Sequence, residues 1–297
     1  MTTEAVRRTF RRILSGDPQG TPPWVRALGE PGDAGWFGPD SEIWLVHSSL
    51  ATLVGGVRAL LLQTCHPLAL AGVEQHSSYR TDPLGRLQRT NLFVTTTTFG
   101  SSTQAQAATA SVRRVHQRVV GTAPDGRRYA ATDPRLLMWV HLTLTDSMLV
   151  AAQTYHRAPV DADAYVADMA VVATAVGVVD PPTTQAQLKS ALAGFEGEVA
   201  GSTVAREVSS FLQWPAAALP RPALPAYVVL ARAATDLLPS WAHPILGTPD
   251  RSSVVRTLDT TTCRTMLRGL QAVLGPRSMA VTLAYQRLGL QPAARPH

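Results

Sequence analysis

The stretch from Asp133 to His156, DPRLLMWVHLTLTDSMLVAAQTYH, predicts the helix around which the fold is built. Aspartate followed by proline is a typical helix start, because the carboxylate accepts free backbone N–H groups and proline fits the first turn. Apolar residues in the rest of the stretch lie on more than one side of the helix. That pattern is typical of a helix surrounded by others, so we expect this one to be central and buried.

Helical spacing of apolar residues continues on both sides of this stretch. Ser41 is placed to cap a helix over 42–65, in which Gly55 and Gly56 mark a close crossing or a break. The threonine run 95–98 stays helical, because four β-branched residues are too few to change the surrounding pattern. The other expected helices cover residues 67–76, 83–99, 101–121, 162–178, 185–199, 203–213, 228–238, 252–273 and 277–288. No run of alternating strands is visible, and residues 121–134 form a loop, so the predicted fold class is all-α.

The chain divides into three parts of different composition. Residues 1–40 combine a short amphipathic helix with a Gly/Pro-rich segment that leads into the main domain. Residues 41–290 form a single large helical domain, and residues 291–297 (QPAARPH) are expected to be a disordered tail.

Composition excludes several classes of function. The 297 residues carry a net charge of +6, but the basic residues are scattered singles and pairs, so we expect no nucleic-acid partner. No apolar stretch reaches the roughly 20 residues of a membrane span, and the N-terminus lacks the apolar run of a signal peptide. Two cysteines make no disulfide framework. We therefore expect a cytoplasmic protein, and the sequence leaves a homo-oligomer open.

Four of the eight histidines fall between His66 and His141, which is typical of a cofactor site. Helical spacing within 83–99 places Arg86, Arg89, Thr90 and Phe93 on one face. Two arginines beside an apolar seam are costly to bury unless an anion meets them, such as a haem propionate, a phosphate or a substrate carboxylate. The alternative is that both guanidinium groups extend to solvent.

His116 and His141 lie on the apolar stripes of consecutive helices. Each has the alternative of being a core imidazole hydrogen-bonded to backbone. Zinc is a poor fit, because the chain has no HExxH or CxxC motif. A di-iron bundle needs Glu-x-x-His repeats, whereas Glu74 precedes His76 by two positions. What remains is a haem site with one histidine ligand in a buried, apolar helical pocket.

The same region resembles the catalytic domain of the rubber oxygenase (latex-clearing protein) family, which includes the MpaB-like oxygenases. The resemblance covers roughly residues 35–180. The segments that carry it are LLQTCHPLALAGVEQHS (61–77), RLQRT (86–90), VRRVHQRVVG (112–121) and the run from Tyr129 through Asp133 to Trp139 and His141.

The resemblance implies an all-α fold, a haem b cofactor and reaction with dioxygen. It implies that His116 is the proximal iron ligand, that Arg86, Arg89 and Thr90 form the distal face, and that His141 is a second pocket histidine. Phe93 and Trp139 are then expected to contact the cofactor. Glu74 is the carboxylate nearest to the position of the family's distal glutamate, and His76 is a candidate sixth ligand of the iron.

Two departures from the rubber-cleaving members bear on the substrate: this chain has Arg89 where they have lysine, and it shows no export signal. We therefore expect a cytoplasmic haem oxidoreductase that uses dioxygen or peroxide on a small or medium apolar organic substrate. The alternatives are a haem peroxidase or desaturase in a biosynthetic pathway, and a haem-binding sensor or carrier without turnover.

Overall fold

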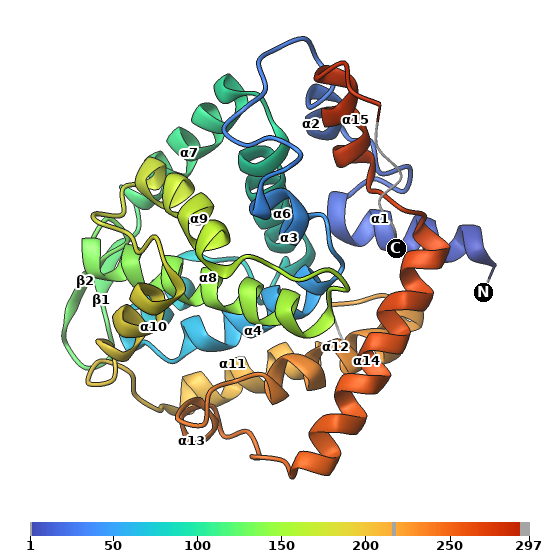
Figure 1. Ribbon diagram of the computed structural model, residues 1–297. Coiled ribbons are helices and arrows are strands. Elements are labelled where there is room, and N and C mark those ends of the chain that lie inside the picture. Colours follow the sequence, from blue (N-terminus) through green and yellow to red (C-terminus); the bar gives the residue numbers. More distant parts are fainter. Residues whose placement is uncertain (1, 216–217, 292–297) are drawn as a thin grey trace.

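The predicted central helix is α8, which runs from Pro134 to Tyr155 and is capped by the Asp133 carboxylate. The computed structural model describes residues 2–215 and 218–291 (Figure 1). Buried side chains occur on different sides of α8, among them Trp139 and His141, which are two positions and therefore about 200° apart. With 66% helix and 2% strand, the structure confirms the prediction of a mostly helical single domain.

The helix α4 (Ala51–Thr64) packs along α8, and Gly55 allows the close approach. A Cβ atom on Gly55 would lie 2.8 Å from Met148 Sδ and 3.1 Å from the Ser147 carbonyl oxygen, whereas Gly56 has open space around it. The crossing predicted at the glycine pair is therefore confirmed, and it depends on Gly55.

The single helix predicted over 42–65 is wrong, because the segment forms two helices. α3 spans Glu42–His47, and α4 begins at Ala51. Between them, Ser48 Oγ donates to the Leu45 carbonyl and Ser49 Oγ accepts from the Ala51 N–H. Short hydroxyl side chains compete with the backbone for such hydrogen bonds, which explains why the chain turns here rather than at the glycines.

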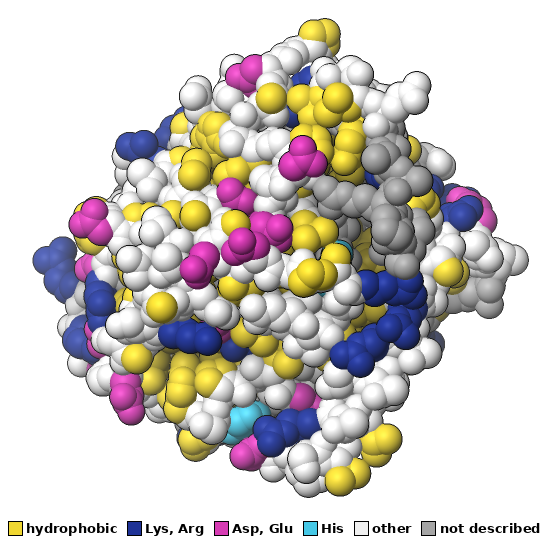
Figure 2. Space-filling model, viewed as in Figure 1, with side chains coloured by type: hydrophobic (Ala, Val, Ile, Leu, Met, Phe, Trp, Pro, Cys, Tyr) yellow, Lys and Arg dark blue, Asp and Glu magenta, His cyan; other side chains and the backbone are white. Residues whose placement is uncertain are grey.

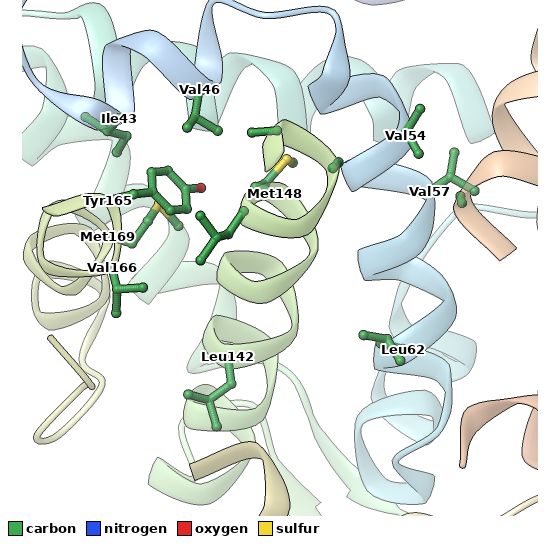
Figure 3. Close-up of a cluster of buried hydrophobic side chains, with 14 of the residues drawn as sticks. Ile43, Val46, Val54, Val57, Leu62, Leu142, Met148, Tyr165, Val166 and Met169 are labelled. Carbon is green, nitrogen blue, oxygen red and sulfur yellow. The ribbon is translucent and has the colours of Figure 1, made fainter. Parts of the chain in front are cut away.

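One hydrophobic core joins α3, α4, α8 and α9 (Ala162–Val176). Figure 3 shows part of it, with Tyr165 and Met169 of α9 extending toward α8. The labelled side chains of this core are Ile43, Val46, Val54, Val57, Leu62, Leu142, Met148, Tyr165, Val166 and Met169. Because α8 is held between α4 and α9, the positions of its remaining side chains are fixed as well.

Three further helices follow α4 in the order expected. α5 spans Pro67–His76, as predicted, and α6 spans Pro83–Phe99, with the Asp82 carboxylate capping the Gly85 N–H. α7 spans Ser102–His116 and begins with a capping box formed by Ser101 and Gln104. The threonines 95–98 are helical, and α6 and α7 pack against each other after the turn at residues 100–101.

The segment after α7 differs from its prediction. The helix expected to reach residue 121 ends at His116, and the expected loop contains a β-hairpin. Its strands β1 (Val120–Thr122) and β2 (Arg128–Ala130) are antiparallel, with Gly121 opposite Tyr129. The turn contains Gly126 at φ 87°, a conformation that favours glycine. Asp-Gly is a typical hairpin turn sequence, so the signal was present in the chain.

The C-terminal half covers the central pair of helices. Against α8 lie α9 and α10 (Gln185–Ala193), while α11 (Thr203–Gln213), α12 (Leu224–Asp236) and α13 (Ala242–Leu246) lie against α4. A 3₁₀ turn at Arg221–Ala223 leads into α12, which packs against α14 (Ser253–Leu274). α13 is a short helix that the apolar spacing did not predict.

Segments from both ends of the chain pack beside α6. α1 (Thr3–Ser15) packs on α6 and α14, and α2 (Pro23–Ala27) packs on α15 (Met279–Arg287). The Arg287 guanidinium donates to three carbonyl oxygens, those of Leu28 at 2.7 Å, Phe99 at 2.8 Å and Asp33 at 3.1 Å. The domain boundary at residue 40 stays a prediction, and residues 292–297 of the predicted tail lie outside the described residues.

The molecular surface carries both signs of charge. On the face seen in Figure 2, basic side chains lie in separate groups, one of them over α14, and acidic side chains cross the middle. Within residues 2–215 and 218–291, no single helix has the length and apolar character of a membrane span. Only α4 and α5 taken together pass that test, and they are bent by 106° at their junction.

Candidate active site

Arg86 is a half-buried cation near the N-terminus of α6. Its Nη1 donates to Ser77 Oγ at 2.5 Å, and no aspartate or glutamate in the described chain forms an ion pair with it. Burial, followed by the positive charge of Arg89, lowers the pKa of the guanidinium. A buried cation without a carboxylate partner is expensive, so this position is suited to receiving an anion.

Arg89 and Thr90 lie on the same stretch of α6 and are exposed. Arg89 donates to Asp82 Oδ2 at 3.3 Å and to Ser78 Oγ at 3.0 Å, while Thr90 Oγ1 donates to the Arg86 carbonyl at 3.1 Å. Both arginines therefore hold the loop that connects α5 to α6. Their guanidinium groups differ in surroundings, because Arg89 has a carboxylate partner and Arg86 has none within the described residues.

His116 is the last residue of α7, so it lies at the end of the α6–α7 pair away from the turn, as Arg86 does. Its Nδ1 is buried and has no hydrogen-bond partner among the described residues. Burial lowers the pKa of the imidazole, which is therefore neutral at pH 7. A neutral imidazole with an unused ring nitrogen has the form in which histidine binds a metal.

His141 is buried in α8 with 7% of its surface exposed. Its Nδ1 is hydrogen-bonded to Thr145 Oγ1 at 3.3 Å, whereas its Nε2 is buried and unpartnered within the described chain. Burial lowers the pKa of His141 to about 4. α8 thus carries a second neutral imidazole with one unpartnered ring nitrogen. Both α7 and α8 pack on α9.

Glu74 and His76 are engaged in contacts of their own. The Tyr79 hydroxyl donates to Glu74 Oε1, and Arg80 Nη2 lies 3.1 Å from Glu74 Oε2. His76 Nε2 donates to the Val120 carbonyl at 3.1 Å. The pKa of Tyr79 is raised by burial and by Glu74, and it is lowered by the charges of Arg80 and Arg86. These side chains tie α5 to the hairpin and to the α5–α6 loop.

The comparison with protein families agrees with this arrangement of α5 to α8. The model of the family described as "ER-bound oxygenase mpaB/B'/Rubber oxygenase, catalytic domain" matches residues 44–272. The chain belongs to this oxygenase family. The resemblance predicted over residues 35–180 is confirmed, and the match extends through most of α14. No curated protein and no solved structure is significantly similar to the chain.

Membership shows the class of activity at a coarse level. An oxygenase domain belongs to an oxidoreductase enzyme, and oxygenases require dioxygen and an organic substrate. The predictions of an enzyme and of these two classes of reactant are therefore confirmed at that level.

Trp139 and Phe93 occupy different parts of the oxygenase domain. Trp139 is fully buried, donates from Nε1 to the Gln63 carbonyl at 3.4 Å and packs against Phe195 with ring centres 5.1 Å apart. Two positions along a helix correspond to a rotation of roughly 200°, so Trp139 and His141 face different sides of α8. Phe93 instead extends between α6, α8 and α9, where it lines a small cavity.

His47 is a residue of this region to which the sequence assigned no role. It lines the same cavity, and its ring nitrogens are hydrogen-bonded to Thr98 Oγ1 at 2.7 Å and to Tyr165 OH at 3.1 Å. Burial lowers the pKa of His47 to about 4. Its position at the end of the apolar run EIWLVH was a signal, but both partners lie far along the chain.

Proposed function

We propose that the chain is a haem b oxygenase in which His116 binds the iron through one ring nitrogen. The observation that carries the proposal is the half-buried, neutral imidazole of His116, whose Nδ1 atom is buried and has no partner within the described residues. Buried polar atoms are normally hydrogen-bonded, and an unpaired one needs a reason such as a missing ligand. When bound, haem would supply the iron at which dioxygen is activated.

The other donor groups fit the same cofactor. Arg86 is a half-buried cation that would neutralise a propionate through a charge-assisted, two-pronged hydrogen bond. His141 offers a second unpartnered nitrogen, which would donate to or accept from a polar group at the reaction site. Arg89 cannot serve as an iron ligand, because a guanidinium has no free lone pair, but it can donate hydrogen bonds.

Family membership supports an organic substrate, because an oxygenase acts on one together with dioxygen. The apolar core around α8, the helix that carries His141, supports an apolar one. On this basis we propose a small or medium apolar organic substrate.

Space for the haem is not preformed at Phe93, where the cavity measures about 20 Å³. Pockets for organic ligands measure roughly 300–1,000 Å³. The proposal therefore requires side chains around His116, at the end of α7, to move and make room for the macrocycle. Those side chains are half-buried or exposed, unlike the α4–α8 core, so the required movement is local.

The proposal places the protein in the cytoplasm. Its support is that Cys65 and Cys263 are both free and buried, and burial raises their pKa values to about 12 and about 11. Thiols with such pKa values are unreactive, so this fold does not need an oxidising compartment. Fractionation of the producing cells, with the protein detected by antibody, tests the location.

The test of the cofactor compares two single substitutions in purified protein. His116→Ala is expected to lose most of its haem and its Soret band, because the proximal ligand is absent. The control His156→Ala, at the end of α8, should keep wild-type loading. Haem stoichiometry and the Soret position are measured for both.

A His116→Ala protein with wild-type loading and an unchanged spectrum would overturn the assignment. His141→Ala then decides whether the other unpartnered imidazole is the ligand. Colourless wild-type protein, purified from haem-supplemented cells and unable to take up added haem, would refute the haem proposal as a whole.

A further inference from the structure

A small cavity lies between α3, α6, α8 and α9 and has a volume of about 20 Å³. Its walls come from all four helices, and the lining residues are His47, Phe93, Val94, Thr97, Leu144, Met148, Met169 and Val172. Figure 3 shows Met148 on α8 and Met169 extending from α9 toward it. The cavity thus lies where the core packing of α8 meets the helix that carries Arg86.

The polar groups in the wall are already used. Both ring nitrogens of His47 have hydroxyl partners, at 2.7 Å and 3.1 Å. Thr97 Oγ1 donates within its own helix, to the carbonyls of Phe93 at 2.9 Å and Val94 at 3.2 Å. A buried water needs two to four polar partners, whereas cavities lined by apolar groups stay dry. The cavity is therefore suited to an apolar occupant.

The size of the cavity limits the occupant further. About 20 Å³ exceeds the roughly 10–15 Å³ that one water-sized molecule needs, but it is far below the roughly 300–1,000 Å³ of an organic ligand pocket. A diatomic gas or a noble-gas atom is the class of ligand that fits. Two methionine sulfur atoms in the lining add polarisable contacts.

The cavity adjoins the candidate active site along two helices. Phe93 follows Thr90 by one turn of α6, and Leu144 follows His141 by one turn of α8. Both side chains line the cavity. The cavity wall thus includes the residues that lie one helical turn from Thr90 and from His141.

We propose that this cavity is a binding site for dioxygen, which holds the gas beside the reaction site. The inference rests on the proposed function for its biological ligand, since an enzyme without dioxygen chemistry has no use for such a site. The binding of an apolar gas does not depend on that function, because it follows from the volume and the lining alone.

Xenon tests the site in the protein as purified. Crystals under xenon pressure are expected to show one xenon atom between Phe93, Leu144 and Val172. Val172→Leu adds one methylene group to the lining and should abolish that xenon site. Val171→Leu is the matched control, because the neighbouring Val171 is 47% exposed and does not line the cavity. An empty wild-type cavity, or one holding an ordered water, would overturn the proposal without any variant.

The holding role is tested by carbon monoxide rebinding after flash photolysis of the reduced haem protein. Val172→Leu is expected to change the bimolecular rate constant two- to five-fold, while Val171→Leu leaves it at the wild-type value. Equal rate constants in the two variants would refute the role beside the reaction site. Xenon bound in a protein that takes up no haem would refute the proposed function and support the gas site.

Discussion

The junction of α4 and α5 and the C-terminal end of α7 each contain an imidazole with a buried Nδ1 atom, in different surroundings. His66 Nδ1 accepts from the N–H groups of Leu68 and Ala69, and its Nε2 donates to Glu198 Oε2 at 3.4 Å. His116 Nδ1 has no partner in the described chain. An unpartnered buried polar atom costs stability, so it is tolerated best where a bound ligand supplies the missing partner. The contrast separates a histidine that stabilises the fold from one that is suited to binding.

The largest expected effect is the loss of stability on replacing His66 with alanine. His66 is 2% exposed, caps α5 and packs against Trp139 at a ring distance of 5.8 Å. Loss of a cap and of a buried ring should lower the free energy of unfolding by about 3 kcal/mol. His116→Ala, measured alongside in cofactor-free protein by urea unfolding, should change it by less than about 1 kcal/mol. Equal losses in the two variants would remove the contrast.

An intermediate effect is expected from pH, again in cofactor-free protein. Burial lowers the pKa of His141 from 6.5 to about 4. Between these values the unfolded chain takes up a proton that the folded chain does not, so the free energy of unfolding falls as the pH drops. Unfolding at pH 7 and pH 5 should show that His141→Gln removes about 1–2 kcal/mol of this loss.

The control for the pH prediction is His156→Gln at the end of α8, which should leave the wild-type slope unchanged. A His141→Gln protein with the wild-type slope would show that this imidazole takes up its proton in the folded state. His141 would then titrate as an exposed histidine does, and its unpartnered Nε2 would no longer indicate a binding site.

The smallest effect is expected from Arg86→Met in the cofactor-free protein. Removing a half-buried charge that has no carboxylate partner should leave stability unchanged or raise it by up to about 1 kcal/mol. Haem affinity should fall, because the propionate loses its partner. Arg89→Met removes an exposed ion pair and should change stability by less than about 0.5 kcal/mol. A marked loss of stability for Arg86→Met would show that its bond to Ser77 matters more than its capacity for an anion.

The sequence predicts those parts of the fold that depend on neighbouring residues. Pro67, Asp82 and Asp133 mark helix starts that the structure reproduces, because caps act within three or four positions. The break at residues 48–50 was missed, since hydroxyl groups that bond the backbone leave no trace in apolar spacing. The hairpin was missed although Asp125-Gly126 is a turn signal, because its strands are only three residues long.

The candidate site shows the same limit more clearly. The helical face of Arg86, Arg89 and Thr90 follows from spacing, and so do the apolar stripes of His116 and His141. Which of these groups lack partners does not follow, because partners come from distant segments: Glu198 lies 132 residues from His66 and Tyr165 lies 118 residues from His47. Local patterns therefore name candidates, and packing decides which of them are structural.

The three hydrogen bonds of Arg287 have a consequence for how the protein is made. Its guanidinium donates hydrogen bonds to carbonyl groups that lie 188, 254 and 259 residues earlier in the chain. While the ribosome is still translating, the loop at Leu28 and Asp33 and the end of α6 at Phe99 must keep these carbonyls hydrated. The oxygenase domain therefore cannot complete its tertiary structure step by step from the N-terminus. Closure of these contacts must wait until α15 has been synthesised, so the N-terminal segments reach their final packing only after that helix is available.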